Sequence, residues 1–394
     1  MTKKEQYRIV LVLGLLTAIG PFSIDMYLPG FTNIADDLNT SLANVALTLS
    51  SYFIGISAGQ LIYGPLLDRF GRRKPLLFGM IVYIAASLGC VFVSDINAFI
   101  ALRLLQAIGT CAAIVASVAM VPDYFSQSDA PKIFSRLMLV MGLSPMLAPT
   151  IGGYIIQYYN WQTVFIILTV LGIIILTAAM MGLPDRDKPN PDISLRPESI
   201  LSNYWAILRT PQFFTYAIAG AVAFSGLFTY IAASPVLFMS IFKVSSKTYG
   251  FIFAFLSVSF IGAAQLNALL LKRFTSMQLV YGSLLFQTLI GLLFLILALN
   301  DLLGFYQVIG MLFLYLMCLG ISNPNCAGLS LAPFSQNRGS ASSLMGALQL
   351  SMGSLSSLVV GLLAKDSLPL IVLVLASTAV LSFTILLVTK KAGK

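Results

Sequence analysis

Long stretches of apolar residues, separated by short polar segments, run through almost the whole chain. One helical crossing of a bilayer needs about 20 mostly apolar residues. The stretches are continuous rather than alternating, which is typical of membrane-spanning helices and not of an outer-membrane barrel. The pattern predicts twelve spans, at residues 8–30, 44–66, 76–93, 98–120, 133–157, 161–183, 211–239, 248–270, 278–299, 303–328, 341–363 and 368–389.

The basic residues lie almost entirely in alternate polar segments. With the N-terminus inside, 19 of the 23 Lys and Arg fall in cytoplasmic segments and three fall outside, while Arg103 lies within a span. This distribution follows the positive-inside rule of membrane proteins. The sequence therefore predicts a multi-pass membrane protein whose N- and C-termini are both cytoplasmic.

The longest polar segment, residues 184–210, divides the chain almost in half. Its four prolines and mixed charges predict a cytoplasmic linker with a short surface helix around 198–208. LLDRF at 66–70 recurs as LLKRF at 270–274, after the second helix of each half, and many secondary transporters are built from such repeats. We expect an N-terminal six-helix bundle at 1–183 and a C-terminal six-helix bundle at 211–394.

The composition excludes several classes of protein. The chain is 58% hydrophobic and 9% charged, so a water-soluble enzyme of this composition would expose too much apolar surface. It has no His, which excludes His-based metal sites and Ser-His-Asp chemistry, and its four cysteines lie in apolar stretches. No G-x-x-x-x-G-K-[ST] loop is present, so an ATP-driven pump is excluded. We expect no cofactor, no metal and no nucleic-acid partner, and we interpret the net charge of +9 as a topology signal.

The loop GPLLDRFGRRKP, from Gly64 to Pro75, combines an acid, four basic residues and turn-forming glycines. Basic residues alone would anchor the topology, but the interleaved Asp68 and Gly71 are not needed for that. Asp68 can accept hydrogen bonds from the N-terminus of a neighbouring helix, and Asp123 is a natural partner for the arginines. We predict a conformational latch made of Gly64, Asp68, Arg69, Gly71, Arg72, Arg73 and Asp123.

Asp25 and Arg103 are the two ionisable residues placed well inside spans. Residue counting places them at nearly the same depth, near the outer face. One interpretation is a static ion pair that holds the helices together, and another is that both side chains reach the outer interface. The third interpretation is a proton site. Intramembrane ionisable groups commonly transfer protons, and their pKa changes when water or a cation enters the cavity.

Helix 133–157 carries Gly142, Pro145, Pro149, Gly152 and Gly153, which allow close helix contact and kinks. A packing seam without any role in selectivity is the alternative interpretation. In the second half, Asn323 and Asn325 flank Pro324 and are expected to interrupt their helix. They either bind substrate or satisfy backbone groups that Pro324 leaves open.

Aromatic residues on the helices expected to face the centre predict a cavity for lipophilic neutral or cationic compounds, because aromatic rings stack and bind cations. An alternative place for such aromatics is the lipid-facing surface. The predicted cavity residues are Phe22, Tyr27, Tyr52, Phe53, Gln106, Phe224, Phe228, Tyr230, Asn323 and Asn325.

These motifs resemble those of a known family. The Gly64 loop matches the G-x-x-x-D-R-x-G-R-R pattern of the major facilitator superfamily in full, and DMYLPGF at 25–31 resembles the end of helix 1 in the Bcr/CflA group of drug:proton antiporters. ALRLLQAIGT at 101–110 resembles the helix 4 motif, and MGLSPMLAPTIGG at 141–153 resembles the antiporter motif of helix 5. The resemblance implies the all-α major facilitator fold, a bacterial inner-membrane location, proton coupling through Asp25 and Arg103, and a leak-sealing role for helix 5.

Our leading hypothesis is a proton-coupled exporter of lipophilic neutral or cationic small molecules, acting as a monomer with protons, substrate and membrane lipids as its partners. The alternative is a carrier dedicated to one physiological small molecule, such as a siderophore or metabolite, in either direction. The stretch SVAMVPDYF at 117–125 lacks the arginines that many Bcr/CflA members carry there, so the substrate range is not transferred. An intramembrane enzyme needs a nucleophile–base pair or two close carboxylates inside the membrane. This class is disfavoured, because the sequence has no His and places only one acid deep inside a span.

Overall fold

The computed structural model describes residues 3–125, 130–184, 189, 197–334, 338–363 and 367–392. Within these ranges all regular secondary structure is helical. The elements are α1 (Lys3–Asp25), η1 (Leu28–Gly30), α2 (Phe31–Asp37), α3 (Leu42–Phe70), α4 (Arg73–Val91), α5 (Ile96–Ala119), α6 (Val121–Tyr124), α7 (Ala130–Tyr158), α8 (Gln162–Gly182), α9 (Pro197–Leu208), α10 (Pro211–Pro235), η2 (Val236–Ile241), α11 (Ser246–Leu270), α12 (Ser276–Leu299), α13 (Phe305–Leu331), α14 (Arg338–Leu363) and α15 (Leu368–Ala392).

Twelve helical segments of the described chain are long and apolar enough to cross a membrane, as the hydrophobic pattern predicts. Most bounds agree with the predicted ones within a few residues. The first segment is longer than predicted, because the helix continues after a short turn at η1 and reaches Asp37. Pro29 and Gly30 lie in this turn, which changes the direction of the chain without ending the apolar segment.

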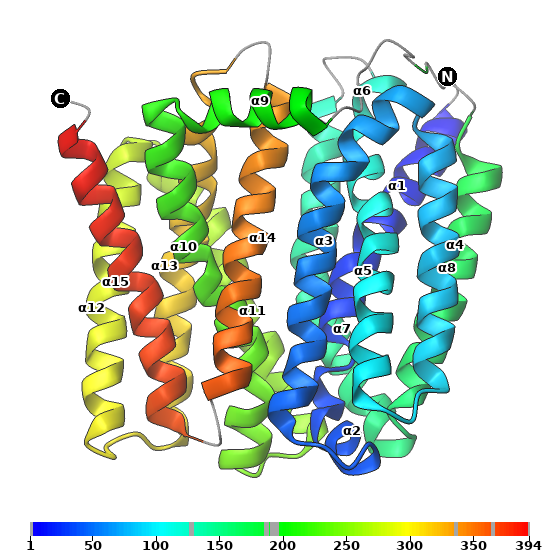
Figure 1. Cartoon of the computed structure of the whole chain (residues 1–394). Coiled ribbons are helices and arrows are strands. Elements are labelled where there is room, and N and C mark those ends of the chain that lie inside the picture. The colour runs from blue at the N-terminus through cyan, green and yellow to red at the C-terminus, as the bar shows by residue number, and fades with distance from the viewer. Residues whose placement is uncertain are drawn as a thin grey trace.

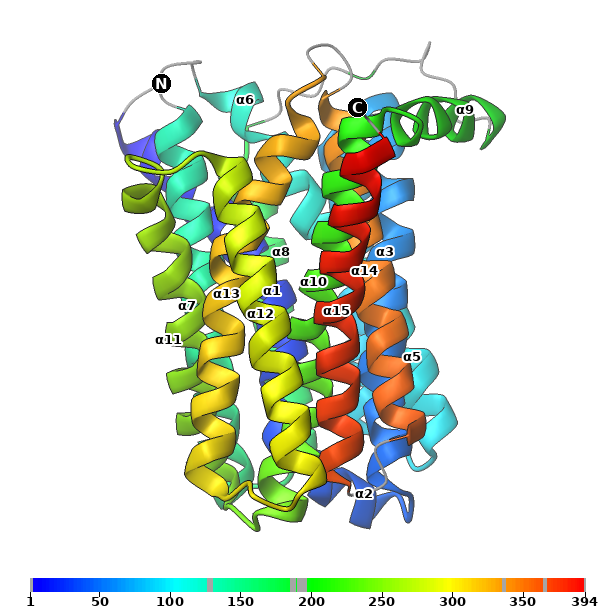
Figure 2. The same cartoon turned by 90° about the vertical axis from the view of Figure 1, so that its left-hand side faces the viewer.

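The spans run side by side in two groups, α1 to α8 and α10 to α15 (Figure 1). In the first group α5 packs on α3, α4 and α1, and in the second α10 packs on α13, α14 and α15. The main contacts between the groups are α3 with α14 and α7 with α11. Both chain termini, α6 and α9 lie at one end of the bundle, here called the termini end, and α2 lies at the opposite α2 end (Figures 1 and 2).

Serine side chains join α3 to α14 where the two groups meet. The hydroxyl oxygens of Ser50 and Ser357 are 2.8 Å apart, and those of Ser57 and Ser351 are also 2.8 Å apart. Ser354 donates to the backbone oxygen of Ser50 at 3.3 Å. Small polar residues allow close helix approach and supply hydrogen bonds between spans, so this serine seam holds the two groups together along α3.

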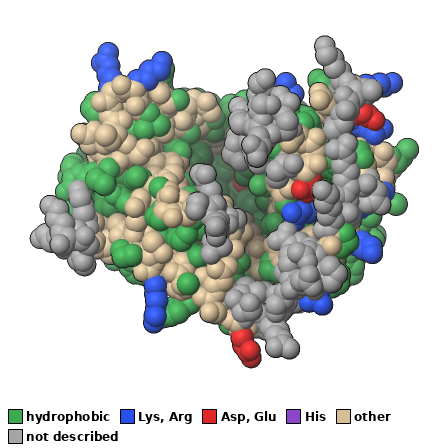
Figure 3. Space-filling model, turned by 90° about the horizontal axis from the view of Figure 1, so that it is seen from above, with side chains coloured by type: hydrophobic (Ala, Val, Ile, Leu, Met, Phe, Trp, Pro, Cys, Tyr) green, Lys and Arg blue, Asp and Glu red, His purple; other side chains and the backbone are tan. Residues whose placement is uncertain are grey.

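Seen from the termini end, the molecule is hollowed between the two groups of helices (Figure 3). Hydrophobic side chains line the visible floor of this hollow. The central space of the bundle is therefore open toward the end that carries both termini.

Candidate functional site

Arg103 on α5 is completely buried. Its guanidinium carbon lies 4.3 Å from the ring centroids of both Tyr27 and Tyr52, in the range of cation–π contact. Nη2 donates to the backbone oxygen of Ser23 at 2.9 Å, and Nη1 donates to Oε1 of Gln106. The side chain therefore does not reach the outer interface, and aromatic faces and neutral oxygens hold its charge within the first group of helices.

Three predicted cavity residues belong to this buried network. Tyr27, Tyr52 and Gln106 are each 0% exposed, so in this structure they present no surface to an open cavity. The physical reason is that each side chain is closed in by Arg103 on one side and by a further hydrogen bond on the other. The further partners are Thr48 at 3.0 Å, Thr110 at 2.8 Å and Ser87 at 2.8 Å, respectively.

Asp25, the last residue of α1, is 2% exposed, and its buried Oδ1 has no hydrogen-bond partner among the described residues. The structure does not bring it into an ion pair with Arg103. Arg103 instead donates to the backbone carbonyl of Ser23, two residues before Asp25. The carboxyl group of Asp25 lies near the hydroxyl groups of Tyr230 and Tyr249, which belong to the other group of helices.

The predicted aromatic residues of the second half lie in a chain of ring contacts. Tyr230 stacks on Phe253 at 5.3 Å between centroids, and Phe228 contacts Phe224 at 5.4 Å. Phe53 of α3 reaches Phe228 of α10 at 4.4 Å, which joins the two groups. Phe53, Phe228 and Tyr230 are buried in these contacts, whereas Phe224 keeps part of its surface exposed, as does Phe22 of α1.

Asn323 and Asn325 do not interrupt their helix, because α13 continues through Pro324 to Leu331. Asn325 donates to Oδ1 of Asn267 on α11 at 2.6 Å and to the backbone oxygen of Ile321 at 2.8 Å. Asn323 is half-buried and accepts a hydrogen bond from Gln349 at 2.9 Å. The predicted interruption is therefore wrong, since neighbouring side chains and the remaining backbone bonds support the helix at the proline.

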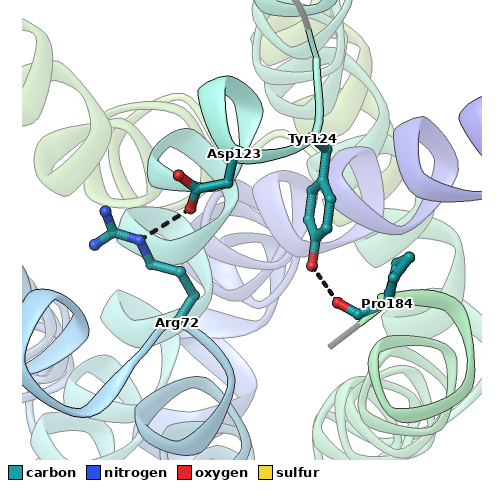
Figure 4. Close-up of polar contacts among 4 residues, drawn as sticks. All are labelled: Arg72, Asp123, Tyr124 and Pro184. Atoms are coloured by element: carbon teal, nitrogen blue, oxygen red, sulfur yellow. Dashed lines mark hydrogen bonds and ion pairs between the residues drawn. The ribbon is translucent and has the colours of Figure 1, made fainter. Parts of the chain in front are cut away.

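The loop between α3 and α4 places the arginines of the predicted latch. Gly71 ends α3 with φ of 84°, a conformation that favours glycine. Arg72 Nε lies 3.2 Å from Asp123 Oδ2, as the sequence predicts (Figure 4). Arg73 donates to the backbone oxygen of Met180 at 2.8 Å. These contacts join the start of α4 to α6 and to the end of α8, all within the first group.

The structure describes the other latch residues only in part. The guanidinium of Arg69 lies 5.9 Å from the ring centroid of Phe70, and Gly64 has open space around its Cβ position. The side chain of Asp68 lies outside the described residues. Tyr124 donates to the backbone oxygen of Pro184 at 2.9 Å, which joins α6 directly to the residues that follow α8 (Figure 4).

Helix α7 carries the glycines and prolines of the predicted antiporter motif, and it remains continuous through Pro145 and Pro149. A Cβ atom added at Gly153 would lie 2.6 Å from the backbone oxygen of Ser246 on α11. One added at Gly152 would meet the backbone oxygen of Met26. These two glycines therefore let α7 approach both α11 and the end of α1 at backbone distance.

Residues of α11 also take part in this contact between α7 and α11. A Cβ atom at Gly250 of α11 would lie 2.7 Å from the backbone oxygen of Pro149, and Ser246 donates to the backbone oxygen of Pro29 at 2.9 Å. Gly142, which lies nearer the termini end of α7, is less crowded. A Cβ atom added there would lie 3.5 Å from the side chain of Ile261. The close contact thus lies at the α2 end and closes the bundle opposite the hollow.

Two parts of this arrangement were not predicted from the sequence. Tyr249, which lies near Asp25, stands at the start of an apolar segment and belongs to no distinguishing motif. The serine seam has a weak signal, because Ser50 and Ser57 are seven residues apart and therefore share one face of α3.

Comparison with known proteins decides the family. Residues 13–357 match the family profile of the Major Facilitator Superfamily. The chain belongs to the major facilitator superfamily.

Relatives and solved structures agree with this assignment. The chain is 31% identical to a bicyclomycin resistance protein homolog of Haemophilus influenzae over 366 residues, which is 93% of this chain and 92% of that protein. It is 27% identical to multidrug resistance protein D of Escherichia coli over 368 residues, covering 91% and 90% of the two chains. The crystal structure of a bacterial homolog of the human lysosomal transporter Spinster, in an inward-facing and occupied conformation, has the same fold, with a TM-score of 0.75 at 14% identity over 99% of this chain and 96% of that one.

The resemblance to the Bcr/CflA group and the all-α, twelve-span major facilitator fold are thus confirmed. As a member of the major facilitator superfamily, the protein is a multi-pass membrane protein and a secondary transporter of small molecules, and not an enzyme. It has bacterial relatives that are named for drug resistance.

Proposed function

We propose that this protein exports lipophilic neutral or cationic small molecules in exchange for protons. The observation that carries the proposal is Asp25, a carboxyl group buried inside a span without an ion pair or a hydrogen-bond partner for Oδ1 among the described residues. Ionisable residues in this setting commonly carry protons through transporters. The drug-resistance names of the relatives support the choice of substrate class.

The geometry supports an alternating-access mechanism between two six-helix bundles, residues 1–183 and 211–394, joined by a linker at 184–210. The hollow opens at the termini end, and the α7–α11 contact closes the α2 end. The distribution of Lys and Arg favours a cytoplasmic termini end, so this arrangement corresponds to an inward-facing state. Substrate then enters the hollow from the cytoplasm and leaves after the α7–α11 contact has separated.

Each set of predicted residues has a role in this proposal. Asp25 carries the proton, and Arg103 acts indirectly, by holding the end of α1 through the carbonyl of Ser23. The Gly64–Pro75 loop with Asp123 supports the cytoplasmic-closed state, and the α7 glycines seal the opposite end. Phe22, Phe224 and Asn323 keep part of their surface exposed and are the predicted cavity residues available to substrate. We further propose a monomer in a bacterial inner membrane, with protons as the coupling ion and surrounding lipids as its other partner.

The test is a pH-gradient assay in proteoliposomes, comparing the wild type with Asp25→Asn against lipophilic drugs and against metabolites and siderophores. We expect drugs to dissipate the gradient through the wild type and not through Asp25→Asn, while drug binding persists. Asp301→Asn is the matched control, because Asp301 is an exposed turn residue with φ of 53°, which asparagine adopts readily.

Two outcomes would contradict parts of the proposal. Transport by Asp25→Asn at the wild-type rate would remove the proton role of Asp25. If only one polar metabolite dissipated the pH gradient, the protein would be a carrier dedicated to that compound, as the alternative hypothesis holds.

A further inference from the structure

Helix α9 (Pro197–Leu208) lies across the termini end, roughly at right angles to the spans, and projects beyond the bundle in Figure 2. Only Arg209 and Thr210 separate its end from Pro211, where the seventh span begins. A span begins where the apolar layer of the bilayer begins. The C-terminal end of α9 therefore lies at the level of the membrane–water boundary.

One face of α9 packs on the protein. Ile207 is 2% exposed and clusters with Phe213 of α10 and Ala341 of α14. Asn203 on the same face donates to Ser340 at 3.1 Å. This packing fixes the orientation of the helix on the second bundle.

A second set of apolar side chains on α9 is exposed. Leu201 is 65% exposed and Trp205 is 56% exposed. They are four residues apart, so they lie together on one flank of the helix. Glu198, Ser202 and Arg209 occupy the remaining exposed face. The helix thus has one apolar side against the protein, one against its surroundings, and a polar strip that remains free for water.

The surroundings at this level are the headgroups and upper acyl chains of the membrane that the spans cross. Tryptophan is enriched at this boundary, because its ring is apolar and its N–H is polar. The guanidinium of Arg209 lies 5.0 Å from the ring centroid of Trp205, so a positive charge lies beside the indole ring. A cation in this position is complementary to the phosphate of an anionic lipid.

We propose that α9 is an interfacial helix that docks on the bilayer around this protein, with Leu201 and Trp205 inserted between the headgroups and Arg209 bound to an anionic phospholipid. This proposal goes beyond the transport function and does not depend on the identity of the substrate. Through it, the connection between the two bundles is attached to the membrane surface.

The chain offers a direct test, because it contains only two tryptophans. Trp161 is 2% exposed and donates to Asp37 of α2, far from α9, so Trp161→Phe leaves Trp205 as the single reporter. In nanodiscs we expect Trp205 fluorescence to be quenched more by lipids brominated near the headgroup than by lipids brominated near the chain end, and to resist iodide. Trp205→Phe is the matched control, since the buried Trp161 should respond neither to iodide nor to the fraction of anionic lipid.

A second measurement does not need Trp161→Phe to fold. The four native cysteines are buried, so a thiol-specific nitroxide labels Leu201→Cys selectively. We expect this label to collide more with oxygen, which partitions into lipid, than with a water-soluble nickel reagent. Greater exposure to the nickel reagent, or Trp205 fluorescence open to iodide and insensitive to brominated lipid, would overturn the proposal.

The lipid preference is tested separately with Arg209→Gln in the Trp161→Phe background. We expect the fraction of anionic lipid that half-saturates the Trp205 emission shift to rise about fivefold, the effect typical of one basic residue at an anionic surface. Lys272→Gln removes an exposed positive charge at the same end and should leave this fraction unchanged. Equal effects of the two substitutions would show general charge attraction instead of a bound headgroup.

Discussion

At the scale of single residues, Arg103 shows how a span accommodates a buried cation without a carboxylate. Two tyrosine ring centroids lie 4.3 Å from its guanidinium carbon, and two neutral oxygens accept its hydrogen bonds. Stacking on aromatic rings needs a flat cation, and the two acceptors need separate donors. The planar, delocalised guanidinium group of arginine meets both needs. Lysine offers a compact charge that stacks poorly and binds fewer partners in fixed geometry.

Arg103→Lys should therefore lower the stability of the purified protein by about 1.5–3 kcal/mol, the typical contribution of a hydrogen bond to a charged group. The measurement is the thermal unfolding midpoint in detergent. Arg73→Lys is the control, because Arg73 also donates to a backbone oxygen but is partly exposed, so its loss should be smaller. Equal losses of stability in the two variants would contradict a special role for the rings of Tyr27 and Tyr52 around Arg103.

At the scale of elements, the contact of α7 with α11 decides which end of the bundle is closed. Gly153 and Gly250 bring the two backbones together so closely that neither position has room for a Cβ atom. Small residues are what permit such a close approach between spans. In the proposed mechanism the motif acts on one conformational state, because separation of the helices would remove the crowding.

Gly153→Ala should shift the protein toward the state that is open at the α2 end. The added methyl group destabilises the closed state by about 1–3 kcal/mol, typical of overpacking, which corresponds to a roughly 5- to 150-fold change in the equilibrium. The measurement is the distance between spin labels at Asn33→Cys on α2 and Lys247→Cys on α11, which should lengthen.

Gly142→Ala on the same helix is the control for this shift. Its new methyl group meets only the side chain of Ile261 at 3.5 Å, an ordinary contact, so the distance distribution should remain that of the wild type. A wild-type distribution in Gly153→Ala would show that the α7–α11 contact does not set the conformation.

At the scale of the whole molecule, the two bundles meet mainly where α3 packs on α14 and α7 packs on α11, and the serine seam lies in the first of these interfaces. Hydrogen bonds between hydroxyl groups in a membrane are modest, on the order of 1 kcal/mol each, so the seam holds a state without locking it. A rocking transporter needs such contacts, because each one has to break in every cycle.

A covalent link across this seam should stop transport. Ser50→Cys with Ser357→Cys replaces hydroxyls that are 2.8 Å apart, and mild oxidation or mercuric ion should cross-link them and reduce turnover by at least about tenfold, reversibly. The measurement is substrate flux before and after reduction.

The control for the cross-link uses two residues within one bundle. Thr17→Cys with Ser117→Cys replaces hydroxyls 3.0 Å apart on α1 and α5, and its cross-link should leave flux nearly unchanged. Full flux through the cross-linked Ser50–Ser357 pair would contradict rigid movement of the two bundles at α3 and α14.

Much of the architecture could be predicted from the sequence. The number of spans, most of their bounds, the surface helix before the seventh span and the Arg72–Asp123 contact all followed from local patterns. The physical reason is that a chain in lipid has to satisfy every backbone group within helices, so apolar length alone determines where a span lies. Short motifs at helix ends are predictable for a similar reason, because their partners are close in the chain or at the same membrane face.

The tertiary structure decided how side chains inside the membrane are paired. Residue counting placed Asp25 and Arg103 at one depth, but in the structure the arginine binds the backbone carbonyl of Ser23, and Oδ1 of Asp25 has no hydrogen-bond partner among the described residues. The same applies to Asn325, which binds Asn267 across two helices, and to the serines of α3 and α14. Depth along a helix is encoded in the sequence, whereas the direction of a side chain around the helix gains meaning only when the helices have packed against one another.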